Sequence, residues 1–255
     1  MNIPKVTIIT AVLNGEKHLE KTIKSIISQD YENFEYIVID GGSIDDTVNI
    51  IKKYEKNIQY WVSEKDEGIS DAFNKGLKAS SGEYVNFQGD GDRLHSPDVL
   101  SRVFKNKQFK HNMLISGRIE RVSEEGESLF LSKFTKRFDE KSLMFKLGIP
   151  HQGLFTHKSF YEKYGLFDLE NIFCMDYEIL LRAYHEFPPV ITKDIVVSKW
   201  RDDGVGNGRE LEIFNEYNHI KVKNKIGHPY YLLFVKKWIL FKHYSKKILG
   251  IYKKY

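Results

Sequence analysis

Residues 6–12 read Val-Thr-Ile-Ile-Thr-Ala-Val, a nearly continuous run of β-branched and apolar residues. Such a run is typical of a parallel strand that is buried on both faces. The next segment, residues 16–29, places its larger apolar residues on one face of a helix. These residues are Leu19, Ile23, Ile26 and Ile27. A buried strand that leads into an amphipathic helix predicts the first unit of an alternating α/β fold.

Three further strand-like segments repeat this pattern, at residues 34–40, 58–63 and 84–88. Helices are predicted between them, near residues 47–54 and at 69–79. Short connections and right-handed crossovers then give a mainly parallel, doubly wound sheet with flanking helices. Beyond residue 95 we expect a hairpin at 118–134, a short strand at 151–155, and helices at 139–147, at 158–164 and from 176 onward.

The composition of the 255 residues, 41% hydrophobic and 29% charged, is typical of a globular protein with a sizeable core. A single cysteine, Cys174, excludes an internal disulfide framework and a zinc site built from several thiolates. The N-terminus lacks the order of a signal peptide, and no apolar run reaches the length of a membrane span. We therefore expect a cytoplasmic protein that is soluble or at most peripheral on the inner face of the cell membrane.

Polar residues follow each predicted strand, at the edge of the sheet where ligands bind in such folds. The fourth strand ends in Gly89-Asp90-Gly91-Asp92. Two carboxylates with glycine between them suit a hard cation such as Mn²⁺ or Mg²⁺, and glycine lets a phosphate group approach. An Asp- and Gly-rich surface turn has the same composition, so both interpretations stay open at this point. No Gly-x-Gly-x-x-Gly motif or phosphate loop is present, so a bound diphosphate would need the metal.

Several motifs together resemble the family 2 glycosyltransferases, which have the Rossmann-like GT-A fold, and in particular the bacterial enzymes that build lipopolysaccharide, capsule and exopolysaccharide. The resemblance covers roughly residues 5–205. The motifs lie at 6–14, 36–47, 63–76, 81–84, 89–92, 151–152 and 176–182. The resemblance implies a nucleotide-sugar donor, and we expect this donor to be linked to UDP. It also implies a glycan or lipid-linked acceptor.

For the donor, the resemblance implies that Asp40 hydrogen-bonds the nucleotide base. Thr10, Leu13 and Asn14 are expected beneath the base and ribose. Asp66 and Asp71 lie in the segment that approaches the ribose, the phosphates and the donor sugar. Together these residues are predicted to form the nucleotide-binding wall of the site.

For the chemistry, the resemblance implies that Asp92 coordinates the cation that bridges the diphosphate, and that Asp90 contacts the ribose or the metal. His151 and Gln152 are expected in the donor-sugar or acceptor pocket. Asp176 corresponds to the catalytic base, and its place at a helix N-terminus favours the charged carboxylate. The alternative for Asp176 is a purely structural role as a helix cap.

The chain departs from the family pattern at three places. Gly41 stands where many relatives have a second acid after Asp40, and Gln88-Gly89 replaces the more usual residues before the metal carboxylates. Residues 199–206 occupy the position of a glycine-rich loop that closes over the donor. The Gln-x-x-Arg-Trp motif of processive synthases is absent, so we expect the transfer of single sugars by inversion.

Two other functions remain as alternatives. A sugar nucleotidyltransferase shares the sheet and the metal carboxylates, but it normally has a glycine-rich basic loop after the first strand, where this chain has Asn14-Gly15-Glu16. A non-catalytic scaffold that binds a nucleotide sugar or a membrane would not need Asp90, Asp92 and Asp176 together. A glycosyltransferase accounts for all three carboxylates.

The chain is divided by these patterns into a catalytic domain, residues 1–206, and a basic, aromatic and helical extension, residues 207–255. Ten lysines and no acidic residue follow Glu216, although the net charge of the whole chain is only +4. Residues 229–255 mix these lysines with aromatic residues, a composition that suits an anionic membrane surface. The alternative is a helical arm packed against protein. No nucleic-acid-binding module accompanies the basic segment, so nucleic acid is not expected as a partner.

Overall fold

The computed structural model describes residues 3–104, 114–145, 147–202 and 208–248, together with Gly204 and Gly206. Its strands are β1 (Val6–Val12), β2 (Phe34–Asp40), β3 (Tyr60–Ser63), β4 (Tyr84–Gly89), β5 (Arg93–Leu94), β6 (Leu114–Val122), β7 (Ser128–Leu131), β8 (Leu154–His157) and β9 (Val190–Arg201). Its α-helices are α1 (Leu19–Ile27), α2 (Thr47–Lys53), α3 (Ile69–Ala79), α4 (Val99–Phe104), α5 (Lys158–Tyr164), α6 (Met175–Arg182), α7 (Glu210–Lys223) and α8 (Pro229–Ile248).

The first four strands form the parallel half of the sheet, in the order β3-β2-β1-β4. In this half β1 is central: Val12 pairs with Asp40 of β2, and Ala11 pairs with Gly89 of β4. Every residue of β1 is buried, as expected for a parallel strand covered on both faces. The predicted α/β fold is confirmed, and the carboxyl ends of β1, β2 and β4 meet at one edge.

The second half of the sheet is mixed. Strand β8 runs antiparallel to β4 and β6, whereas β9 runs parallel to β6 and antiparallel to β5. The predicted hairpin is present as β6 and β7. The helix expected at 139–147 is a short 3₁₀ helix, Glu140–Met144, and the strand expected from residue 151 begins with another, His151–Gly153.

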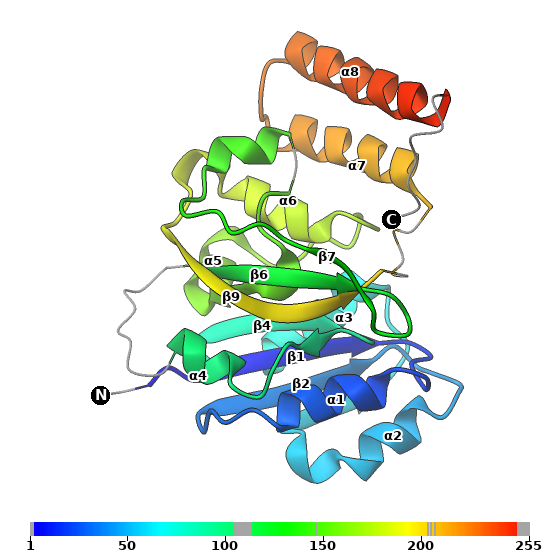
Figure 1. The fold of residues 1–255 in the computed structure, drawn as a ribbon, viewed down its shortest axis with the longest axis vertical. Coiled ribbons are helices and arrows are strands. Elements are labelled where there is room, and N and C mark those ends of the chain that lie inside the picture. The colour runs from blue at the N-terminus through cyan, green and yellow to red at the C-terminus, as the bar shows by residue number, and fades with distance from the viewer. Residues whose placement is uncertain are drawn as a thin grey trace.

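Two hydrophobic clusters cover the two faces of the sheet. Alternate residues of β1 point to opposite faces, so Ile8 packs with α1, α2 and α4, and Ile9 packs with α3, α5, α6 and α7. Figure 1 shows α1 and α2 on one side of the sheet and α6, α7 and α8 stacked at the other end of the molecule. The sheet is thereby buried between helices on both faces, which the continuous apolar strands require.

The predicted C-terminal extension is helical. Helix α7 lies between α6 and α8 (Figure 1). Leu232 and Val235 are buried on the inner side of α8, while Leu233 and several of its aromatic side chains are exposed. Within the described residues, no helix combines the length and hydropathy needed to cross a bilayer. The division of the chain at residue 206 stays a prediction.

Helix α3 approaches β1 closely at Gly76, and this contact gives a stability prediction. A Cβ at residue 76 would lie 2.5 Å from Cγ2 of Ile9. We expect Gly76→Val to lower the free energy of unfolding by about 1–3 kcal/mol, because the packed core must shift to accept the side chain. Urea unfolding measures this change. Lys78→Val in the same helix is the matched control, since Lys78 is exposed and loses only helix propensity, about 0.5 kcal/mol; equal losses in both variants would contradict the close packing.

Candidate functional site

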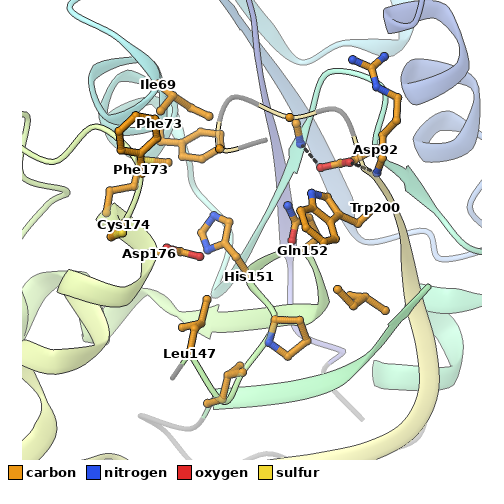
Figure 2. A pocket seen from close by; sticks show the side chains of 18 of the residues that line it. Ile69, Phe73, Asp92, Leu147, His151, Gln152, Phe173, Cys174, Asp176 and Trp200 are labelled. Carbon is orange, nitrogen blue, oxygen red and sulfur yellow. Dashed lines mark hydrogen bonds between the residues drawn. The ribbon is translucent and has the colours of Figure 1, made fainter. Parts of the chain in front are cut away.

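A cavity of about 1570 Å³ opens at the carboxyl ends of β1 and β4. One wall comes from the end of β1, the start of α3 and the loop that carries Asp90 and Asp92. The opposite wall comes from the segment before α6, from Asp176 in α6 and from Tyr217 in α7. Figure 2 shows Asp92, His151 and Asp176 projecting into this cavity from different elements. The position agrees with the general rule that ligands of open α/β sheets bind at the strand ends.

The structure brings most of the sequence-predicted residues to this cavity. The lining includes Leu13, Asp66, Asp90, Asp92, His151, Gln152 and Asp176. Four predicted residues do not line it: Thr10, Asn14, Asp40 and Asp71. The carboxylates predicted for the metal and for the base therefore share one cavity, although residues 90 and 176 are far apart in the sequence.

Asp92 is fixed by backbone donors from two strands. The N–H of Gly89 donates to its Oδ2 at 3.1 Å, and the N–H of Arg201 donates to its Oδ1 at 3.0 Å. The Gln152 side chain also hydrogen-bonds to it. Burial outweighs these bonds and raises the pKa of Asp92 to about 7. A cation beside this carboxylate would offset the cost of burying its charge. Gln152 thus lines the cavity and also hydrogen-bonds the Asp92 carboxylate.

Arg201 is a further residue of the site, and its role was not predicted from the sequence. Gly91 has a φ of +85°, and a Cβ there would lie 2.5 Å from Nη1 of Arg201. Glycine at residue 91 therefore permits both the left-handed turn and the close approach of the guanidinium. Arg201 lines the cavity at the end of β9 and brings a permanent positive charge next to the two aspartates.

The donor set of this wall fits a divalent cation that is shared with a substrate. Asp90 and Asp92 both line the cavity. The described residues contain no group of three or more His, Cys, Asp or Glu side chains that could hold a metal. Magnesium and manganese sites of nucleotide enzymes need only one or two carboxylates, because waters and substrate phosphates supply the remaining ligands. Two carboxylates at a cavity wall match that requirement.

Asp176 lies in the first turn of α6 and is partly exposed to the cavity. Its Oδ1 accepts a hydrogen bond from the N–H of Tyr177 at 2.8 Å. The helix N-terminus was expected to favour the charged form, but burial, assisted by the charge of Glu216, raises the pKa of Asp176 to about 6. Such a carboxyl is ionised at neutral pH and is more basic than an exposed aspartate, which suits a general base.

His151 is the first residue of η3, the 3₁₀ helix His151–Gly153, and lines the cavity. Its ring stacks on Phe87, with centroids 5.1 Å apart and an interplanar angle of 15°. Burial lowers the pKa of His151 to about 4, so the ring is neutral at pH 7. Its Nε2 is buried and makes no hydrogen bond with any residue that the structure describes. A polar group of a substrate could reach this nitrogen only after the side chains that cover it move.

Asp40 is fully buried beside the cavity rather than on its wall. Its carboxylate accepts bonds from the N–H of Ser43 at 3.0 Å, from the Ser43 hydroxyl and from the Ser63 hydroxyl at 2.5 Å. The neighbouring position is Gly41, where a Cβ would lie 2.6 Å from Oδ2 of Asp66. The Asp66 carboxylate thus occupies the space, next to the end of β2, that a side chain at position 41 would fill.

The other three predicted residues outside the cavity make local contacts. Thr10 is buried in β1 and accepts a hydrogen bond from Tyr36 at 3.1 Å. The side chain of Asn14 accepts from the N–H of Ile44 at 3.0 Å. Asp71, at the start of α3, forms an ion pair with Lys75 at 3.4 Å. Thr10 thus joins β1 to β2, Asn14 joins the loops that follow these strands, and Asp71 pairs within α3.

Fold and site thus define an α/β protein with one cavity at the ends of its parallel strands and acidic residues on two of the cavity walls. Residues 7–168 match the profile described as Glycosyl transferase family 2. The chain belongs to glycosyltransferase family 2.

Curated relatives agree with this assignment. An uncharacterized glycosyltransferase of Mycobacterium tuberculosis is 34% identical over 210 residues, which cover 81% of this chain and 79% of the relative. A PGL/p-HBAD biosynthesis glycosyltransferase of Mycobacterium bovis is 24% identical over 245 residues, which cover 93% of this chain and 92% of that protein. Both matches extend beyond residue 168, so the relatives share more than the family domain.

Solved structures show the same fold. S. aureus TarS in complex with UDP-GlcNAc superposes with a TM-score of 0.68 at 17% identity, over 94% of this chain and 73% of that chain. A mannosyltransferase from Pyrobaculum calidifontis in complex with GDP-Man and Mn²⁺ gives a TM-score of 0.64 at 18% identity, over 89% of this chain and 66% of that chain. The chain spans 64% of another crystallised TarS fragment, residues 1–349, and 39% of a longer TarS chain.

The bonds at Asp40 give a prediction that separates a structural from a nucleotide-binding role. Asp40→Asn leaves a single acceptor oxygen for three donors, so we expect the free energy of unfolding without nucleotide to fall by about 1–3 kcal/mol. Urea unfolding of the nucleotide-free protein measures the loss. Asp30→Asn, at an exposed position, is the control and should change stability by less than about 0.5 kcal/mol. Unchanged stability with weaker nucleotide binding would assign Asp40 to the base instead.

Proposed function

We propose that this chain is an inverting, metal-dependent glycosyltransferase that moves a single sugar from a UDP-linked donor to a hydroxyl of a glycan or lipid-linked acceptor. The observation that carries the proposal is the shared cavity, with Asp90 and Asp92 on one wall and Asp176 on another. Separate acidic groups suit separate tasks, one beside the leaving diphosphate and one beside the attacking hydroxyl. A non-catalytic scaffold that binds a nucleotide would not need the carboxylate of Asp176, with its raised pKa, on the second wall.

The donor wall is proposed to bind the nucleotide through Leu13, Asp66 and Arg201. The Leu13 side chain is 59% exposed at the cavity and offers an apolar surface to the base and ribose. Asp66 lies beside Gly41 and can accept bonds from the base or ribose. The Arg201 guanidinium provides donors for phosphate oxygens. A divalent cation held by Asp90 and Asp92 would neutralise the charge that develops on the leaving diphosphate.

The reaction is proposed to be an in-line displacement at the anomeric carbon. The oxygen of the acceptor hydroxyl forms the new bond, while the bond from the anomeric carbon to the diphosphate oxygen breaks on the opposite face and the configuration inverts. Asp176 receives the hydroxyl proton, an effect worth about 10²–10⁴ in rate. The neutral His151 ring can hold a sugar or acceptor hydroxyl through Nε2 once the side chains that cover this nitrogen move. Holding both substrates in one cavity supplies the orientation.

The relatives support the choice of substrates in this proposal. TarS was solved with UDP and with UDP-GlcNAc, which favours a UDP-linked donor, whereas the Pyrobaculum mannosyltransferase was solved with GDP-Man and Mn²⁺, which favours a metal. The mycobacterial relative named for PGL/p-HBAD biosynthesis favours an acceptor in a surface glycan or glycolipid pathway. A pathway of bacterial surface polysaccharide synthesis is the proposed setting.

A lipid-linked acceptor would be reached from the inner face of the membrane through α8. Four exposed aromatic residues recur along one stripe of this helix, opposite the buried Leu232 and Val235. They are Tyr230, Phe234, Trp238 and Phe241, with exposed fractions of 80%, 63%, 48% and 63%. Lys237 and Lys242 lie at or beside the stripe, and Lys242 stands 5.1 Å from the Trp238 ring. Aromatic side chains with flanking lysines suit an anionic lipid surface.

The two proposed carboxylate roles predict different defects. Asp176→Asn is expected to lower kcat by about 10²–10⁴ while leaving nucleotide binding intact. Asp92→Asn is expected to abolish both transfer and the metal-dependent thermal shift. A thermal-shift screen of nucleotide sugars with Mn²⁺ identifies the donor, and release of nucleoside diphosphate from it measures turnover. In the wild type, turnover should rise with pH through about 6, because Asp176 must lose its proton. Normal turnover in Asp176→Asn would sink the base assignment.

The α8 surface predicts binding to anionic vesicles. The double variant Phe234→Ser with Phe241→Ser should float with phosphatidylglycerol vesicles about tenfold less than the wild type, because it loses apolar contact area. Neither protein should float with pure phosphatidylcholine vesicles, and added salt should weaken wild-type binding. Leu129→Ser, at an apolar position of β7 that is 45% exposed, is the matched control. Flotation of the double variant at the wild-type level would rule out this surface.

A further inference from the structure

Glu216 of α7 binds the segment that leads into α6. Its Oε1 accepts a hydrogen bond from the N–H of Phe173 at 3.1 Å and from the N–H of Cys174 at 3.0 Å. Its Oε2 lies 3.2 Å from the same Phe173 nitrogen. Cys174 is the residue before the first turn of α6, and Asp176 lies in that turn. A single carboxylate of the C-terminal extension therefore holds the chain two residues before the proposed base.

Helix α6 satisfies its N-terminus only in part. The Cys174 side chain makes no capping bond, and within the first turn the Asp176 carboxylate accepts from the N–H of Tyr177. Glu216 supplies the acceptor for the N–H of Cys174 at the N-cap and brings a negative charge to the positive end of the helix, where it is favourable. The half-buried position of Glu216 strengthens the interaction relative to an exposed pair.

Two further contacts from α7 reach the same two residues. Sγ of Cys174 lies 3.8 Å from the carbonyl oxygen of Ile213, and the Arg209 guanidinium lies 5.6 Å from the centroid of the Phe173 ring. Tyr217 stacks edge-on against Tyr177, with centroids 4.3 Å apart. Residues of three successive turns, from the N-cap Arg209 to Tyr217 of α7, thus contact the start of α6.

We propose that Glu216 is a positioning residue for catalysis, which holds the start of α6 so that the Asp176 carboxylate faces the substrate cavity. The inference rests on the proposed function of Asp176 as the base. It also assigns the extension a part in the active site, since α7 lies outside the predicted catalytic domain and beyond the matched residues 7–168. Glu216 itself touches neither substrate nor the reacting atoms.

The charge of Glu216 acts on Asp176 in addition to its hydrogen bonds. The titratable or charged groups around Asp176 are His151, Cys174, Tyr177, Arg209, Glu210, Glu216 and Tyr217. Burial raises the pKa values of Cys174, Tyr177 and Tyr217 and lowers that of His151, so these four groups are neutral at pH 7. The Glu216 carboxylate raises the pKa of Asp176 beyond the effect of burial. Removing this charge should therefore make Asp176 more acidic.

Three variants test the inference. Glu216→Ala removes the acceptor and the charge, and we expect kcat to fall by about tenfold to a hundredfold with the donor KM unchanged, as for a misplaced catalytic group. Glu216→Gln keeps one acceptor oxygen but loses the charge, so its kcat at pH 8 should stay within about threefold of the wild type. Asn215→Ala is the matched control, because Asn215 lies next to Glu216 in the same helix and is exposed. Its kcat should be unchanged.

Two measurements without substrate keep the test independent of the base assignment. Amide hydrogen exchange of residues 171–176 should quicken at least tenfold in Glu216→Ala and stay near the wild-type rate in Glu216→Gln. NMR titration of the Asp176 carboxyl carbon should give a lower pKa in Glu216→Gln than in the wild type. Wild-type kcat and exchange in Glu216→Ala would overturn the positioning role.

The reference variant is Asp176→Asn. If it turns over normally, the proposed base is wrong, whatever the Glu216 variants do. If it is inactive while Glu216→Ala keeps full activity and a normal thermal unfolding midpoint, only the positioning role fails. If Glu216→Ala does not fold, Glu216→Gln provides the test. An unchanged pKa of Asp176 in that variant would also overturn the inference.

Discussion

The structure depends on one constraint, the burial of β1 on both of its faces. Every residue from Val6 to Val12 is removed from water, so the strand must have a hydrogen-bonded neighbour on each side and helices above and below. These neighbours are β2 and β4, and their parallel direction brings three strand ends to the same edge. The loops that follow these strands then have to meet there. The position of the substrate cavity is a consequence of how the apolar core is covered.

Burial also sets the electrostatics of the cavity. It raises the pKa of Asp92 and Asp176 and lowers that of His151, so one physical cause changes the protonation of three groups. The change at Asp176 makes its carboxylate a stronger base, as the proposed role needs. At Asp92 burial disfavours the charged form, and a bound cation would restore it. The histidine stays neutral at pH 7. Fixed donors such as the N–H of Arg201 limit the shift at Asp92 without cancelling it.

The sequence predicted the parallel half of the fold because strands buried on both faces are continuous apolar runs, which local pattern reveals. It also predicted Asp90, Asp92 and Asp176, which the structure brings to one cavity. It did not predict β9, whose apolar pattern is broken by Lys193 and Asp194 and whose pairing with β6 joins distant parts of the chain. The contact of Arg201 with Gly91 could not be predicted for the same reason, because the two residues are far apart in the sequence and meet only where β9 ends. At Asp40 the motif is local, but one of the serines that bind it, Ser63, comes from the end of the neighbouring strand β3.

The position of Glu216 has a consequence for how this chain can diverge from its relatives. The residues that match the family profile end at 168 and include every residue of the proposed donor wall except Arg201. The proposed base, its proposed anchor in α7 and the exposed aromatic stripe of α8 all follow that point. Sequence change in the last third of the chain can thus alter the choice of acceptor while the donor machinery stays recognisable. Membership of the family is accordingly more informative about what the enzyme takes a sugar from than about what it gives the sugar to.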